Sequence, residues 1–382
     1  MNDGVIEESL PVVPLKRLAA SRYAQLVACA LREVWTAGGA PVLLPRNPAA
    51  LLGTIAHQLL KEAGQSAEGN FDPVRQWDEL SEKLERELKQ SWLERPLVPL
   101  KSSGRMYEVL KLRSCARALE IASSVQRRTT RAFKAIPGIG FEVWVESEDK
   151  SVVGLIDAAR MTIRGLVLSD VKSGEVLEHP EGFSPKQLKE SHRIQLKLYA
   201  ALYFQTYRRW PDTLQIVPLT GETVEVPFDG EECSQILKEA QSTVHSLNAS
   251  ITSGTTTHAT LANPTPQNCA FCPYRPGCRA YRLALARGEQ LGQWPPDIFG
   301  MVWDINALSD GRVNLRVAGD GGGQHTIRAL RSHVGRHPTL QSIQRGDRIG
   351  FFNARVSSNR AEFSEGPLAT LYKILRSGDA AD

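Results

Sequence analysis

The sequence predicts an α/β protein in which a mixed sheet flanked by helices is followed by a small β-barrel. Two strand-like stretches in mid-chain, Gly154-Leu155-Ile156-Asp157 and Ser169-Asp170-Val171-Lys172, form a hairpin with helix-periodic segments on both sides. After residue 298 the pattern changes to short strand-like runs separated by Gly, Asp and Asn turns. A proline-containing break at 288–297 lies between the two patterns and predicts a linker.

The central hairpin carries two carboxylates and an ammonium group. Asp157 and Asp170 supply the oxygen donors that hard divalent cations prefer. Asp170 and Lys172 are two residues apart on one strand, so their side chains share a face and point at the same phosphate. This group predicts a phosphodiester-cutting centre that uses Mg²⁺ or Mn²⁺. Taken alone, the motif is equally an exposed, charged strand end.

Four further residues are candidates for the same centre. Gln195 and Tyr199 are four residues apart in a helix-periodic run, so they lie on one helical face. His57 lies in a helical pattern upstream, and Glu142 lies on the apolar strand just before the hairpin. Taken alone, His57 is better explained as an ordinary surface or core histidine.

In this order the motifs resemble the RecB-like branch of the PD-(D/E)XK nuclease superfamily. That family shows Gly-x-x-x-His on a helix, a strand Glu, Gly-x-Ile-Asp, Asp-x-Lys and Gln-x-x-x-Tyr, which match His57, Glu142, Asp157, Asp170 with Lys172, and Gln195 with Tyr199. The resemblance implies a restriction-endonuclease-like sheet in residues 15–287, with a helical insertion at about 65–135. It implies that His57, Asp157 and Asp170 bind the metal, with Glu142 completing or orienting the shell. Lys172 would position the attacking water, while Gln195 and Tyr199 would support Lys172 and hold the DNA backbone.

Three cysteines are closely spaced as Cys269-x2-Cys272-x5-Cys278 on a loop turned by Pro and Gly. Such thiolates converge on one point, which suits a metal centre better than a disulfide. The segment around Cys29 resembles the N-terminal helix of iron–sulfur RecB-like nucleases such as AddB and the CRISPR-associated RecB-like exonucleases, although Ala30 stands where the family often has proline. The resemblance implies a [4Fe–4S] cluster held by Cys29 and the triplet, as a structural staple. Thiolate spacing alone equally allows a zinc site.

Composition predicts a cytoplasmic protein with two or three domains. The chain has 382 residues, no apolar run approaches the ~20 residues that cross a bilayer, and the acidic N-terminal tail (1–14) has no signal-peptide pattern. The net charge of +4 does not by itself indicate a nucleic-acid partner. Cations are concentrated between residues 101 and 134, either along a DNA-binding cleft or on a solvated helix face. They are Arg105, Lys111, Arg113, Arg117, Arg127, Arg128, Arg131 and Lys134.

Residues 298–382 contain several short strands with a helical or irregular piece at 331–344. This pattern predicts an OB-fold barrel, with an SH3-like barrel as the alternative. An OB-fold would bind single-stranded nucleic acid through aromatics and cations, or else serve for protein docking. The candidates are Phe299, Trp303, Phe351 and Phe352 with Arg316, Arg328, Arg348 and Arg355. Every proposed ligand lies upstream of residue 290, so truncation there is predicted to leave the active centre intact.

The sequence therefore predicts a metal-dependent DNA nuclease, an exonuclease rather than an endonuclease, that acts on single strands or DNA ends in repair, recombination or defence against foreign DNA. The alternative is a DNA-end-binding module with little cleavage that partners a helicase. No Walker-type phosphate-binding motif is present, so any helicase activity would belong to another chain. No membrane partner is expected.

Overall fold

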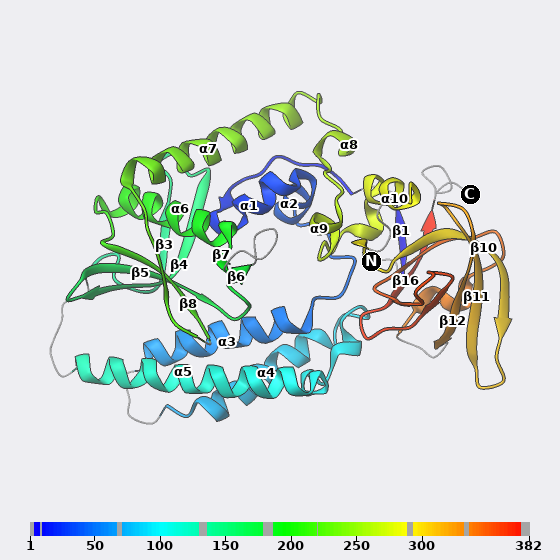
Figure 1. Ribbon diagram of the computed structural model, residues 1–382, viewed down its shortest axis with the longest axis horizontal. Helices are drawn as coiled ribbons and strands as arrows, with labels where there is room; N and C mark the ends of the chain where they lie inside the picture. Colours follow the sequence, from blue (N-terminus) through cyan, green and yellow to red (C-terminus); the bar gives the residue numbers. More distant parts are fainter. Residues whose placement is uncertain are drawn as a thin grey trace.

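A computed structural model describes residues 4–7, 10–66, 71–129, 136–178, 186–219, 221–288, 293–331 and 336–375, without the side chains of 124–129. The molecule is elongated, with one sheet and its helices at one end and a second sheet at the other (Figure 1). Within the described residues, no helix is long and apolar enough to span a membrane.

The first sheet has the strand order β2-β4-β5-β8-β9, with β3 paired to β4. Strands β4 and β5 form the antiparallel hairpin that the sequence predicted, whereas β8 lies parallel to β5. The crossover between β5 and β8 contains helix α6, Glu190–Tyr207. The strands are β2 Leu18–Ala19, β3 Gly140–Glu146, β4 Val152–Thr162, β5 Gly165–Lys172, β8 Thr213–Pro218 and β9 Val224–Val226.

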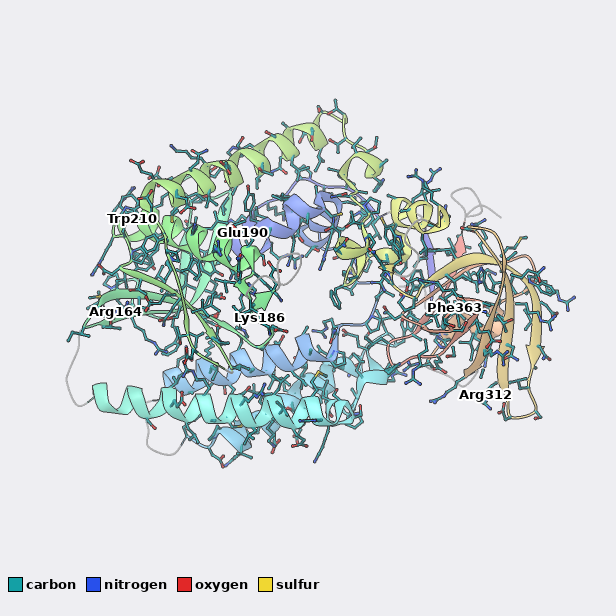
Figure 2. All side chains as sticks on the ribbon, viewed as in Figure 1. Arg164, Lys186, Glu190, Trp210, Arg312 and Phe363 are labelled. Atoms are coloured by element: carbon teal, nitrogen blue, oxygen red, sulfur yellow. The ribbon has the colours of Figure 1, made fainter. Side chains whose placement is uncertain are left out.

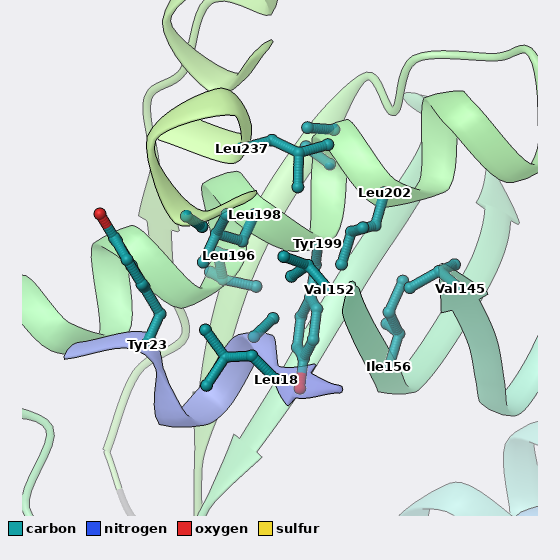
Figure 3. Close-up of a cluster of buried hydrophobic side chains, with 14 of the residues drawn as sticks. Leu18, Tyr23, Val145, Val152, Ile156, Leu196, Leu198, Tyr199, Leu202 and Leu237 are labelled. Atoms are coloured by element: carbon teal, nitrogen blue, oxygen red, sulfur yellow. The ribbon is translucent and has the colours of Figure 1, made fainter. Parts of the chain in front are cut away.

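One face of this sheet is covered by α6, with α7 (Gly230–Thr252) packed beyond it (Figure 1). Leu168 of β5 and Ile216 of β8 point into this core, and their strand neighbours point to the other face because successive side chains alternate. Figure 3 shows Tyr199 among the leucines and valines of this cluster. The short N-terminal elements η1 Ala20–Arg22, α1 Tyr23–Ala28 and α2 Ala30–Ala37 pack against the same core.

Three helices lie on the other side of the sheet (Figure 1). They are α3 Pro48–Gln65, α4 Pro73–Leu88 and α5 Arg105–Thr129. Asn47 and Asp72 cap the first two helices by accepting hydrogen bonds from backbone N–H groups, and a proline follows each cap. The three helices share an apolar cluster centred on Trp77, which is fully buried. This arrangement brings α3, and with it His57, against the sheet.

The second sheet has eight strands in the order β1-β16-β13-β10-β11-β12-β15-β14. It curls into a half-barrel, so the prediction of a closed OB-type barrel is wrong. Strand β1 extends the sheet beyond β16, and among the described residues the two end strands β1 and β14 do not pair with each other, so the sheet is not closed. The strands are β1 Val5–Glu7, β10 Ile298–Ala307, β11 Arg312–Gly319, β12 Gln324–Arg331, β13 Arg348–Phe352, β14 Arg355–Val356, β15 Glu362–Ser364 and β16 Thr370–Leu375.

The aromatic residues that the sequence assigned to base stacking lie mainly inside the protein. Phe299, Phe351 and Phe352 are at most 4% exposed, and only Trp303, at 38%, reaches solvent. Phe299 packs edge-on against Tyr281 of α10 and against Phe352, so these rings join the two parts of the chain. Three of the four therefore cannot stack on a ligand, because their faces are already covered.

A buried ion pair fixes the second sheet to the cysteine loop. Arg275 Nε donates to Asp297 Oδ2 at 2.7 Å, and both side chains are almost completely inaccessible. The same carboxylate accepts hydrogen bonds from the Tyr281 hydroxyl and from the backbone N–H of Asn353. Residue 297 belongs to the segment predicted as a linker, of which 289–292 lie outside the described residues. The remaining domain boundaries stay predictions.

Short elements complete the chain. Figure 2 shows Arg164 toward one end of the long axis and Arg312 toward the other. These elements are η2 Arg95–Leu97, η3 Leu100–Ser103, β6 Leu177–Glu178, β7 Gln187–Leu188, α8 His258–Leu261, α9 Pro266–Cys269, η4 Arg275–Gly277, α10 Arg279–Ala286 and η6 Pro338–Ser342.

Candidate active site

Gln195 on α6 connects the residues predicted for catalysis at the end of β5. Its Nε2 donates to Asp170 Oδ1 at 2.8 Å and to the Tyr199 hydroxyl at 3.0 Å. Its Oε1 accepts from Lys172 Nζ at 3.0 Å. Because the amide donates and accepts at once, it fixes the carboxylate and the ammonium group relative to each other. Burial raises the pKa of the Tyr199 hydroxyl, which therefore stays protonated.

Asp170 is a buried carboxylate, 3% exposed, and burial raises its pKa to about 6 despite the nearby Lys172. Lys172 Nζ lies 2.8 Å from Asp170 Oδ2, but this oxygen has no hydrogen-bond partner among the described residues. A buried oxygen that has an ion-pair neighbour but no hydrogen bond is a position at which a cation lowers the cost of burying the charge.

Asp157 and His57 lie on the more accessible side of this group. Asp157 Oδ2 accepts a hydrogen bond from the backbone N–H of Val171 at 2.7 Å, and His57 Nδ1 lies 3.7 Å from the same oxygen. The Asp157 carboxylate raises the pKa of His57 above its ordinary value. The charge of Asp157 contributes in turn to the raised pKa of Asp170. The hairpin and α3 thus bring these three residues together.

Glu142 reaches the site through a local irregularity in β3. The β3–β4 register pairs Phe141 with Ala158 and Val143 with Ile156, which places Glu142 opposite Asp157. Its φ is +50°, an angle that L side chains adopt at a cost. The carboxylate lies 2.7 Å from the Nζ of Lys61, the residue one helical turn after His57 on α3.

Two motif glycines bring the helices close to the sheet. A Cβ on Gly154 would lie 2.8 Å from the ring of Tyr199, and one on Gly53 would lie 2.5 Å from Ser173 Oγ. Contacts below 3.0 Å are not tolerated without movement of a neighbour. Glycine at these positions therefore lets Tyr199 pack on β4 and lets α3 carry His57 toward Asp157.

We expect Gly154→Ala to lower the free energy of unfolding by about 1–3 kcal/mol, the usual cost of overpacking a buried site. The Tyr199 ring is almost fully buried and must move to admit the methyl group, which disturbs its hydrogen bond with Gln195. Urea unfolding measures the effect. Gly174→Ala is the control, because a Cβ there meets nothing within 4 Å. Equal losses in the two variants would show that the close contact is unimportant.

The two aspartates suit a hard divalent cation, since Mg²⁺ is usually held by one or two carboxylates together with water and substrate phosphates. Among the described residues, no group of three or more His, Cys, Asp or Glu side chains is arranged to hold a metal ion. His57, Asp157, Asp170 and Glu142 are therefore neighbours but not a ready-made ligand cage. Their assignment as metal ligands stays a prediction.

The four predicted cluster ligands lie in one region without forming a ligand group. Asn268, beside Cys269, donates to the carbonyl of Ala28, beside Cys29, at 2.9 Å. Burial, and then the neighbouring Cys272, Cys278 and Cys29, raises the pKa of the Cys269 thiol. All six cysteines are free, and Cys115 and Cys233 are buried. The described residues do not show an iron–sulfur site.

Most of the described part of the cation-rich segment belongs to α5, whose Arg117, Glu120 and Ile121 line a cavity beside the site. Lys111 pairs with Asp78, and Arg117 pairs with Glu120. Arg127, Arg128, Arg131 and Lys134 lie outside the described side chains. The segment's role in DNA binding therefore stays a prediction.

Several residues near the site were missed by the sequence analysis. Lys61, Phe141, Arg160, Ser169 and Gln215 line a cavity that also includes His57, Glu142 and Asp157. The spacing of four between His57 and Lys61 could have indicated a shared helical face. Phe141 and Gln215 come from β3 and β8, whose pairing the sequence did not define. Arg160 and Ser169 lie on the predicted hairpin, but no local pattern showed that their side chains line a cavity.

A comparison of the sequence with known protein families agrees with a nuclease-like site in this sheet. The chain matches the PD-(D/E)XK nuclease superfamily over residues 17–279, well over half of its length. The match covers the catalytic sheet, α3, α6 and the cysteine loop, and it identifies the superfamily rather than a branch of it. Nucleases of this superfamily typically use a divalent metal. No curated protein matches the chain. The chain belongs to the PD-(D/E)XK nuclease superfamily.

Proposed function

We propose that this protein is a metal-dependent nuclease that hydrolyses phosphodiester bonds in DNA, as an exonuclease on single strands or DNA ends, in repair, recombination or defence. The observation that carries the proposal is the group formed by Asp170, Lys172 and Gln195 beside Asp157. A protein that only binds DNA gains nothing from a buried carboxylate whose pKa is raised to about 6. A raised pKa at a buried charge pair is typical of a functional site.

Asp157 and Asp170 would hold Mg²⁺ or Mn²⁺, with His57 and Glu142 as neighbours that complete or orient the shell. When bound, the metal lowers the pKa of water and offsets charge on the phosphate. Lys172, held by Gln195, positions the attacking water and stabilises the oxyanion that develops. Tyr199 is buried and stays protonated, so it holds Gln195 in place and does not release its own proton during the reaction.

The test is a time course with end-labelled and circular single-stranded DNA, in Mg²⁺, in Mn²⁺ and without divalent cations. We expect cleavage only with a metal, and loss of linear but not circular substrate for an exonuclease. Cleavage of the circle would support an endonuclease instead. Absence of cleavage under all conditions would reject the nuclease assignment.

We further propose that the chain belongs to the RecB-like branch and that Cys29, Cys269, Cys272 and Cys278 hold a [4Fe–4S] cluster, with zinc as the alternative. Arg32 supports an anionic thiolate centre, because its buried Nε has no hydrogen-bond partner among the described residues. Its charge also opposes the rise that burial causes in the pKa of Cys272. The thiols would have to turn toward one another to bind the cluster.

Protein purified without oxygen should be brown and contain about four iron atoms per chain. Cys272→Ser should remove the iron and the visible absorbance and lower Tm, because the ligands join both ends of the nuclease domain. Cys233→Ser is the control, since this buried thiol lies on α7 and is not a proposed ligand. Colourless protein with stoichiometric zinc would replace the cluster by a structural zinc site.

A further inference from the structure

A cavity of about 270 Å³ lies between the first sheet and helices α3 and α5, directly beside the catalytic group. His57, Glu142 and Asp157 form the wall that it shares with the active site. Half of the remaining lining residues are apolar, and the other half are polar or charged. Recognition pockets for small planar groups are built in this way. The apolar lining comes from Leu60, Ile121, Phe141, Ala158, Val171 and Val217.

Strand alternation places one polar pair on the floor of this cavity. Ser169 of β5 and Gln215 of β8 are register partners, and both lie on the face opposite the α6 core. The Gln215 amide donates to the Ser169 hydroxyl at 2.8 Å, and Ser169 is 5% exposed. An amide and a hydroxyl offer both donors and acceptors to the edge of a flat heterocycle.

A cation–π contact between Arg160 and Phe141 forms the side of the cavity. The guanidinium carbon of Arg160 lies 4.9 Å from the centre of the Phe141 ring. Phe141 precedes the irregular residue Glu142, and its partner across the strands is Ala158, which also lines the cavity. Aromatic rings and arginine planes are the groups on which unpaired bases stack.

Two partly exposed ion pairs lie at the rim, Lys61 with Glu142 and Arg117 with Glu120. Pairs between accessible side chains are worth about 1 kcal/mol or less, so a phosphate can compete for the cations. The cations would then hold the backbone of a strand whose base lies inside the cavity.

We propose that this cavity binds the base of an unpaired nucleotide next to the bond that is cut. The proposal rests on the proposed nuclease function and deepens it, because it names the part of the substrate that the site recognises. A base inside a duplex reaches such a pocket only after it is unpaired and unstacked. The pocket therefore gives the enzyme a preference for single strands.

Binding of two ligands tests the proposal without depending on cleavage. The ligands are a fluorescent eight-residue oligodeoxythymidine and a fluorescent abasic strand with the same number of phosphates. Full-length Asp170→Asn protein in Mg²⁺ serves as the parent. We expect it to bind oligodeoxythymidine at least ~10-fold more tightly than the abasic strand, since a stacked base contributes ~1–3 kcal/mol and 1.4 kcal/mol is tenfold.

Adding Gln215→Leu should reduce this preference to roughly threefold or less, with affinity lost mainly for the strand that carries bases. Phe141→Leu is the second variant, in case the first fails to fold, and Tm is measured for both. Gln235→Leu, at an exposed position of α7, is the matched control and should keep the parent's preference. The proposal would be overturned if the parent bound the two ligands with equal affinity. It would also be overturned if both variants lost the same factor of affinity for the abasic strand as for oligodeoxythymidine. A wild-type protein that cuts no DNA rejects the nuclease function, yet the binding result still decides whether the pocket recognises a base.

Discussion

Asp170→Asn should reduce the rate of DNA cleavage by about 10³-fold or more while leaving the protein folded. The substitution removes a proposed metal ligand, and metal-ion stabilisation of a phosphoryl transition state is worth several kcal/mol, each 1.36 kcal/mol being tenfold in rate. The asparagine oxygen can still accept the hydrogen bond from Gln195. The measurement is the initial rate on linear single-stranded DNA in Mg²⁺ and in Mn²⁺.

The same variant should be at least as stable as the wild-type protein at pH 8. The folded-state pKa of Asp170 is raised to about 6, so the ionised carboxylate destabilises the fold at any pH above that value. This cost fades as pH falls through 6 and is absent below the ordinary value of 3.8. The Tm advantage of Asp170→Asn should therefore shrink between pH 8 and pH 5. If Asp170→Asn cleaved DNA at the wild-type rate, the catalytic assignment would be wrong. If its Tm were far below that of the wild-type protein, the loss of activity would be due to unfolding.

Asp297→Ala should lower the free energy of unfolding by about 3–5 kcal/mol, the usual result of removing one partner of a buried ion pair. It leaves the guanidinium of Arg275 buried without its counter-charge, although backbone carbonyls of the cysteine loop still accept from it. It also removes the acceptor for the Tyr281 hydroxyl and for the N–H of Asn353. Urea unfolding followed by circular dichroism measures the loss.

Asp310→Ala is the matched control, because its pair with Arg312 is about half exposed and surface pairs contribute about 1 kcal/mol or less. A loss of less than 1 kcal/mol in Asp297→Ala would mean that the ion pair contributes little to joining the second sheet and the cysteine loop. For the same reason we expect truncation at residue 290 to destabilise the cysteine loop, although every proposed ligand lies upstream of residue 290. The truncated chain would expose Tyr281 and leave Arg275 without Asp297.

Local pattern was sufficient for the elements that carry the site. Alternation gave the hairpin that became β4 and β5, and helical periodicity gave α3 and α6. The i, i+2 spacing of Asp170 and Lys172 and the i, i+4 spacing of Gln195 and Tyr199 already fix which side chains share a face. These relations depend only on the period of a strand or helix, so the sequence alone determines them.

Only the tertiary structure decided which faces meet. Lys61, Gln215 and Phe141 reach one cavity because α3 packs across a sheet whose strand order is not written in any local pattern. The second sheet also depends on long-range pairing, since its strand β1 comes from the other end of the chain and pairs along the edge of β16. The sequence predicted that Phe299 and Phe352 bind a ligand. Both are buried instead, because contact with Tyr281 and Tyr372 removes their apolar surface from water. Long-range pairing and burial of this kind depend on the whole fold, and no segment encodes them alone.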